Sequence, residues 1–150
     1  MAPRLHERHT VQLASLQAID LRALRRPTRE SDPAKPRLAP RNADLVNLSE
    51  DGRALDVRLR VALRLRLADE ETWEIHVVLL GHFTADRDLT SDQAESFARD
   101  SGLYVLWPFA RAHIDQLARL AGITSAPQLP LIVRPRPTSI GESSSPNQER

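Results

Sequence analysis

The sequence predicts a segregated α+β domain, with strands in the first part of the chain and helices after them. Two consecutive runs of alternating apolar residues indicate neighbouring strands, and helix start signals follow them along the chain. With 150 residues and 41% hydrophobic composition, the chain is long enough for one domain with a substantial core.

Three stretches differ in composition from this pattern. Residues 1–9 are polar and are expected to form a flexible N-terminus, and residues 135–150 have the composition of a disordered tail. Residues 27–53 carry several prolines among polar residues, which predicts a long surface loop instead of regular structure. The folded domain is therefore expected to span residues 10–134.

The first segment of the folded part, residues 11–25, can be interpreted in two ways. Leu13, Leu16 and Leu24 fit the apolar stripe of a helix. The same segment fits a strand if a bulge near Ser15 corrects its alternation. Periodicity alone leaves both alternatives open.

The clearest strand signal is the run LDVRLRVALRLRL at residues 55–67. Every odd position is apolar, and strict alternation places one strand face on a core and the other toward water. Turn signals stand at residues 50–52 and 69–71. The water-facing positions carry four arginines: Arg58, Arg60, Arg64 and Arg66.

The next run, residues 73–83, alternates in the same way but has Val78 and Leu80 on its second face. The two runs predict an antiparallel hairpin whose second strand needs cover on both faces. A small domain with such a strand usually completes its cover by self-association or leaves a groove for an apolar partner. Three apolar residues in the polar loop either join such a groove or form a small cluster under the loop. These are Leu45, Val46 and Leu48.

A short helix is expected after the hairpin. Thr90 and Gln93 fit a capping box, in which each side chain satisfies a backbone amide of the first turn. The helix is expected over residues 91–99, with Gly102 as a stop.

A main helix is expected to begin at Pro108, because the first helical residue needs no amide donor. The helix should run to Ala121 and end at Gly122. Trp107 precedes it and Phe109 flanks its apolar stripe. The stripe consists of Ala110, Ile114, Leu117 and Ala121.

Composition and charge disfavour several classes of function. The formal net charge is +1, so no global field attracts nucleic acid or an anionic membrane. The chain has no cysteine, which removes disulfides and thiolate metal sites and fits a reducing compartment. No apolar run is long enough to span a bilayer, and no signal peptide opens the sequence. A cytoplasmic protein is therefore expected.

Catalytic motifs are missing from the sequence. It contains no Gly-rich phosphate loop, no G-x-S-x-G and no H-E-x-x-H. His76 and His82 share a strand face but lie about 20 Å apart, too far to bind one metal ion. We expect no enzyme activity, no cofactor and no metal. The alternative function is a nucleic-acid-binding module that uses the arginine face, although aromatic residues for base stacking are missing beside it.

The stretch LYVLWPFARAHIDQLARLAGI, followed by APQLPLIV, resembles the SecB family of export chaperones. In that family an aromatic or apolar residue, Pro, an aromatic residue and Ala-Arg open the main helix, matched here by residues 107–111. Residues 81–83 match a Gly-x-Phe-like strand end, and residues 128–132 match the Leu/Pro-rich segment after the helix. The resemblance covers residues 11–134 in order, and only the helix motif is specific.

The resemblance implies four antiparallel strands with a long crossover loop between the first and second, followed by a short helix and a main amphipathic helix packed on the sheet. Residues 11–25 then form the first strand. It also implies a homotetramer, built as a dimer of dimers with the main helices between the sheets. The implied function is an ATP-independent holdase that binds unfolded or aggregation-prone polypeptides in apolar grooves.

The resemblance assigns site residues by position. The residues assigned to the client-binding groove are Leu45, Val46, Leu48, Val78, Leu80, Leu129 and Leu131. The residues assigned to helix packing within the oligomer are Trp107, Phe109, Arg111, Ile114 and Leu117.

Two departures from the export chaperones bear on the partner. SecB proteins that deliver cargo to the motor SecA have acidic sheet surfaces, whereas arginines dominate the matching region here, which disfavours SecA as a partner. The last helix of the export chaperones is replaced by residues 134–150. In both respects the chain is similar to the SecB-like chaperones of toxin–antitoxin–chaperone systems, whose client is an antitoxin. The export role and the antitoxin role both stay open.

Overall fold

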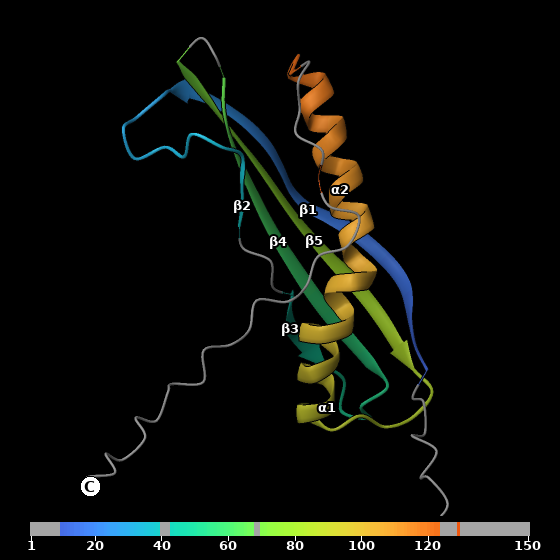
Figure 1. The fold of residues 1–150 in the computed structure, drawn as a ribbon. Helices are drawn as coiled ribbons and strands as arrows, with labels where there is room; N and C mark the ends of the chain where they lie inside the picture. The colour runs from blue at the N-terminus through green and yellow to red at the C-terminus, as the bar shows by residue number, and fades with distance from the viewer. Residues whose placement is uncertain (1–9, 40–42, 68–69, 124–128, 130–150) are drawn as a thin grey trace, which may run out of the picture.

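The computed structural model describes residues 10–39, 43–67, 70–123 and 129. One antiparallel sheet carries one helical segment on a single face (Figure 1). The predicted α+β class, with strands before helices, is confirmed. The elements are β1 (Val11–Pro27), β2 (Arg37–Ala39), β3 (Ala43–Leu48), β4 (Ala54–Arg66), β5 (Glu71–Ala85), α1 (Ser91–Ser96), the π-helix η1 (Phe97–Gly102) and α2 (Leu103–Leu120).

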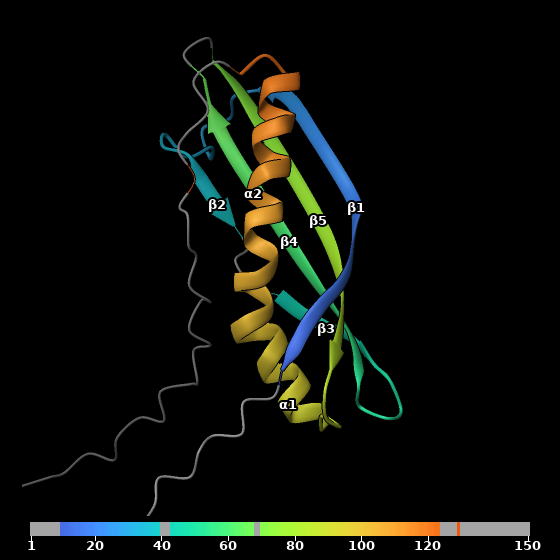
Figure 2. The ribbon, with the colours of Figure 1, turned by 90° about the vertical axis from the view of Figure 1, so that its right-hand side faces the viewer.

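The sheet has four strand positions, as the resemblance implies. Its order is β1-β5-β4, and both β2 and β3 pair with the far edge of β4. β2 pairs with residues 62–64 of β4 and β3 with residues 55–59, so the two short strands share one position. The chain therefore crosses from one edge of the sheet to the other between β1 and β2 (Figure 2).

The prediction of an irregular loop over residues 27–53 is wrong in its second half, where β2 and β3 form. The free edge of β4 offers unpaired backbone donors and acceptors, and pairing with them outweighs the polar, proline-rich composition. The predicted turn before β4 is confirmed: Gly52 has φ +70°, and a Cβ there would lie 2.6 Å from the carbonyl oxygen of Leu89.

The first segment is a strand, β1, which pairs with β5 along its whole length. Its register shifts twice, between Leu13 and Ser15 and between Ala18 and Asp20. The first shift is the predicted bulge near Ser15, and the second was not predicted. Each bulge inserts a residue, so the apolar side chains of one face recur at intervals of two and three residues. That spacing explains why the segment also fits a helix.

The core lies between the helical segment and one face of β4 and β5, here called the inner face. The odd-numbered residues of β4 from Leu55 to Leu65 are all buried there, as the alternation predicts. Trp107 is the largest fully buried side chain. The helix packs tightly on the sheet at Gly81, where a Cβ would lie 2.8 Å from a methyl group of Leu106. The Gly-x-Phe element therefore serves close packing of the helix on the sheet.

Two of the predicted helix ends are confirmed, the start at the capping box and the stop at Gly122. The Thr90 hydroxyl accepts from the Gln93 amide at 3.2 Å, and the Gln93 side chain accepts from the Thr90 amide at 3.0 Å. At the other end Gly122 has φ +76°, and the amide of Ile123 donates to the Ala118 carbonyl at 2.9 Å. This hydrogen bond belongs to a Schellman motif, which needs the left-handed conformation that glycine adopts easily.

The predicted separation of two helices between residues 99 and 108 is wrong. α1, η1 and α2 follow one another without a break; Gly102 is helical, and Pro108 lies inside α2. A proline inside a helix costs about 3 kcal/mol, because it removes a hydrogen bond and crowds the preceding turn. Burial of one continuous stripe outweighs this cost, since buried residues lie on the sheet side both before and after the proline. These residues are Leu103, Leu106, Trp107, Ala110, Ile114 and Ala118.

Replacement of Pro108 by Ala should stabilise the protein, because Ala restores an amide donor on the exposed side of the helix. We expect the free energy of unfolding to rise by about 1–3 kcal/mol, measured by urea unfolding followed by circular dichroism. Ala112→Pro, one turn later on the exposed surface of α2, is the matched variant and should lose about 3 kcal/mol. A less stable Pro108→Ala protein would show that the packing of α2 requires the proline.

Candidate functional site

The sheet leaves one face open. α1, η1 and α2 all lie on the inner face, and no helix of the described ranges covers the other face, here called the outer face (Figures 1 and 2). Even-numbered residues of β4 and β5 point to the outer face, because successive strand residues alternate. The predicted arginine face of β4 therefore lies on this open side.

The residues predicted for the client groove do not lie together. Leu45 and Leu48 pair with Val57 and Leu55, so their side chains are on the inner face, where they pack against the core. Val46 sits at a bulge of β3 and is 49% exposed.

The other four predicted groove residues are also separated. Val78 and Leu80 are half-buried on the outer face of β5. Leu129 is half-buried against the core, and Leu131 lies outside the described residues. The six described residues lie on two faces and do not line one groove within a single copy of the chain, so the assignment to client binding stays a prediction.

The residues predicted for helix packing take different positions on α2. Trp107 and Ile114 are buried against the sheet, and Leu117 packs partly against the same core. Arg111 is half-buried, and Phe109 is 42% exposed. Phe109 is thus free to contact a second copy, whereas Trp107 and Ile114 already serve the fold of one chain.

Large apolar side chains are exposed in two further regions, in which the sequence pointed only to Phe109. One is the edge strand β1, whose faces were not assignable without its bulges. The other is the exposed side of α2, whose first turns were not expected to be helical. The residues are Ile19, Leu21 and Leu24 on β1, and Tyr104, Val105, Phe109 and Leu120 on α2.

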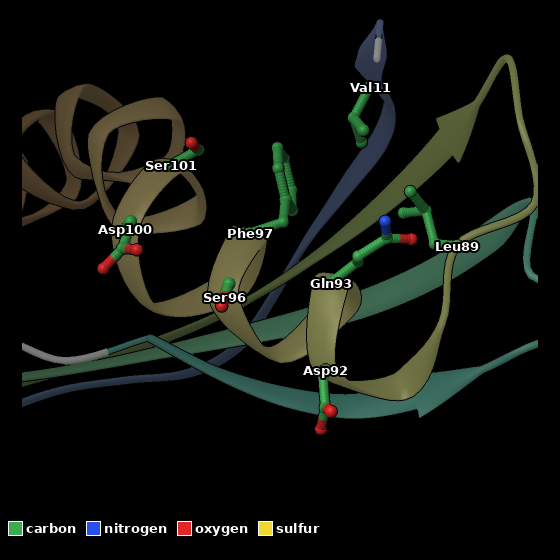
Figure 3. A pocket seen from close by; sticks show the side chains of 8 residues that line it. All are labelled: Val11, Leu89, Asp92, Gln93, Ser96, Phe97, Asp100 and Ser101. Atoms are coloured by element: carbon green, nitrogen blue, oxygen red, sulfur yellow. The ribbon is translucent and has the colours of Figure 1, made fainter. Parts of the chain in front are cut away.

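A hollow of about 490 Å³ lies between the start of β1 and the α1–η1 segment (Figure 3). Val11, Leu89 and Phe97 give it an apolar interior, and the side chain of Gln93 also points into it. The Phe97 ring is held by an edge-to-face contact with Phe83, with centroids 5.2 Å apart. We call this site the terminal hollow. The sequence did not reveal it, because its apolar residues come from three separate segments.

A second hollow, of about 540 Å³, lies on the outer face across β1, β4 and β5. We call it the outer hollow. Four apolar residues form part of its lining, and the others are three arginines, one histidine and a single carboxylate. The lining residues are Ile19, Asp20, Arg22, Arg58, Arg60, Val61, Ala62, His76 and Val78.

The charged residues of the outer face differ in whether they are paired. Arg22 pairs with Asp20 at 3.0 Å, and Arg64 lies 3.4 Å from a Glu74 oxygen. Arg58 and Arg60 form no ion pair with any carboxylate in the part of the chain that the structure describes. The Nε atom of Arg58 is buried and has no hydrogen-bond partner there.

An ion-pair network at one end of the outer face fixes the start of the crossover. The buried Asp32 carboxylate accepts two hydrogen bonds from the Arg26 guanidinium, at 2.6 and 2.8 Å, and one from the Arg29 amide at 2.7 Å. The Thr72 hydroxyl donates to it at 3.1 Å, and Arg26 also pairs with Glu74. The Arg26 hydrogen bonds are the main cause that lowers the pKa of both Asp32 and Glu74.

Replacement of Asp32 by Asn should lower the midpoint of thermal unfolding, because the Arg26 guanidinium loses its ionised partner. A carboxyl group whose pKa is lowered by folding stabilises the folded state above its unfolded pKa, near 4, and loses this contribution as the pH falls further. The difference in unfolding midpoint between the variant and the native protein should therefore be largest at about pH 7 and should shrink below about pH 4.

Asp88→Asn is the matched control for this comparison, because Asp88 pairs with Arg53 on the exposed surface. Exposed ion pairs contribute little to stability, so its unfolding midpoint should stay close to that of the native protein. A difference for Asp32→Asn that does not depend on pH would contradict the ionic origin of the stabilisation.

No three His, Cys, Asp or Glu side chains of the described residues group in a way that would hold a metal ion. In the same part of the chain, no helix is both long and apolar enough to cross a membrane.

The sheet order, the crossover and the single helical segment define a SecB-like fold. Among solved structures, the chain is similar to the SecB-like chaperone Rv1957 of Mycobacterium tuberculosis, in complex with a ChAD peptide from the Rv1956 HigA1 antitoxin. The TM-score is 0.64 at 15% sequence identity, over 84% of this chain and 93% of that chain. No family model matches the chain, and no curated protein matches it in sequence. The resemblance to SecB is therefore shown at the level of the fold.

Proposed function

We propose that the protein is a cytoplasmic, ATP-independent chaperone that holds unfolded or aggregation-prone polypeptides. The observation that carries the proposal is a SecB-like fold with apolar surface left uncovered on β1, on α2 and in the terminal hollow. Exposed apolar patches on a folded protein are typical of interaction sites. Binding by uncovered apolar surface needs no catalytic group and no nucleotide.

The client surface in this proposal includes the terminal hollow. Its interior is apolar, and it opens to solvent beside the exposed residues Asp92 and Asp100. A cavity of this size accepts one or two apolar side chains of an extended polypeptide, and carboxylates at its rim favour basic residues next to them. An antitoxin segment is the client class that the fold neighbour suggests, since that protein was solved with an antitoxin peptide.

Self-association covers the remaining apolar surface in this proposal. β1 is an edge strand of 17 residues, and its free edge can pair with the same strand of a second copy. The exposed side of α2 then provides a second contact, between two such dimers. The result is the dimer of dimers that the sequence resemblance implies.

Val11→Asp tests the terminal hollow, because it places a charge in the apolar interior and an apolar client side chain would then desolvate that charge. We expect about tenfold more protein to be needed for half-suppression of client aggregation, measured by light scattering. Gln12→Asp is the matched control, since Gln12 is exposed and does not line the hollow. Failure of the native protein to suppress aggregation at equimolar ratio would overturn the proposed function.

Phe109→Arg tests the contact through α2, because it places a charge at the centre of the exposed apolar side. The native protein should have about four times the chain mass of 16.9 kDa by light scattering after size exclusion, and the variant about half of that. Ser91→Arg, at the exposed start of α1, is the control and should keep the native mass. A native protein that is monomeric would contradict the proposed assembly.

A further inference from the structure

We propose that the outer hollow binds an acidic segment of a partner protein, at a site separate from the apolar client surface. The occupant is a peptide that carries carboxylates on both sides of an apolar side chain. This inference is independent of the proposed chaperone function, since the arginines that carry it line neither the terminal hollow nor the exposed side of α2.

Uncompensated positive charge is the first observation behind this proposal. Arg58 and Arg60 lie two residues apart on β4, so about 7 Å separates their backbone positions on one face. Asp44 lies opposite Arg58 in the strand ladder but forms no ion pair with it. Three other carboxylates on this face are already engaged: Asp20 by Arg22, Asp56 by His82, and Glu74 by Arg26.

The state of Arg58 is the second observation. Its Nε atom is buried, and no acceptor among the described residues reaches it. A buried donor without a partner costs free energy, and a turn of the Arg58 side chain toward a carboxylate in the hollow would remove this cost. A guanidinium and a carboxylate also match in geometry, because two parallel hydrogen bonds can form between them.

The apolar part of the hollow decides between an acidic protein and a nucleic acid. Val78 and Ala62 lie between the charged groups, and Ile19 borders them on β1. These aliphatic side chains suit an aliphatic side chain of a peptide. No Phe, Tyr or Trp side chain lines the hollow to stack on a base, and the net charge of +1 attracts no polyanion from a distance.

The chain's own C-terminal residues are a poor match for the hollow. Residues 134–150 contain three arginines and two glutamates, so this stretch is not acidic. An occupant with several carboxylates is therefore not this C-terminal stretch, and we assign it to a partner protein.

Fluorescence anisotropy with a labelled peptide of Glu, Asp and Leu tests the proposal directly. The full-length native protein should bind it, and the same peptide with Gln and Asn in place of the acids should not bind. Arg58→Gln combined with Arg60→Gln should weaken binding about five- to tenfold, because two charge-assisted contacts are lost. Arg29→Gln combined with Arg119→Gln removes the same charge outside the hollow and should change binding less than about twofold.

Two further measurements keep the test independent of folding defects and of the chaperone proposal. Arg58→Glu combined with Arg60→Glu should reverse the charge preference of the outer hollow. This variant should bind a peptide of Lys and Leu and should no longer bind the acidic peptide. The Arg58→Gln and Arg60→Gln protein should suppress client aggregation as the native protein does. Loss of suppression in that protein would overturn the separation of the two sites.

Three outcomes would overturn the acidic-segment proposal. Equal weakening by both double Gln variants would mean that only the overall charge matters. Binding of the neutral peptide as tightly as the acidic one would mean that the hollow is simply apolar. Competition by a single-stranded RNA at lower concentration than the acidic peptide, with a steep dependence on salt, would identify a nucleic acid as the occupant.

Discussion

The contact between the helical segment and the inner face of β4 and β5 is the interaction on which the rest of this structure depends. It buries the six odd-numbered residues of β4 from Leu55 to Leu65 against a stripe that runs through η1 and α2. Each fully buried aliphatic side chain contributes roughly 1.5–3 kcal/mol, so this one layer outweighs the cost of a proline inside the helix. The absence of a side chain at Gly81 allows Leu106 to come close.

Because the helix covers only one face, the arrangement leaves two kinds of surface uncovered. The apolar surface lies along β1, on the exposed side of α2 and in the terminal hollow. The charged surface lies on the outer face, where arginines from β4 and Val78 line the same hollow. The edge strand and the helix therefore offer surface for association with polypeptides, while the outer face differs in chemistry from both.

Local signals in the sequence were sufficient for some elements and not for others. The alternation of β4, the capping box at Thr90 and the stop at Gly122 each depend on neighbouring residues, and all three were predicted correctly. The helix start predicted at Pro108 was wrong, because the local preference of proline for a helix start is weaker than the burial of a continuous apolar stripe. β2 and β3 were missed, since their pairing depends on an edge of β4 that only the folded sheet provides. To predict the candidate site, one has to know which face of the sheet each residue occupies. The bulges of β1 change these faces along the strand, and only the first of them was predicted from the sequence.

The register of β4 ties the core and the charged face together. Its odd-numbered residues form the core layer and its even-numbered residues carry the arginines, so a shift by one residue would bury Arg58 and Arg60 and expose Leu59. Burial of two unpaired guanidinium groups is so unfavourable that such a shift is excluded. The arginines therefore also specify the register of the central hairpin, whatever they bind. A role in ligand binding is distinguished from this structural role by Gln replacements, which stay polar and preserve the register while they remove the charge.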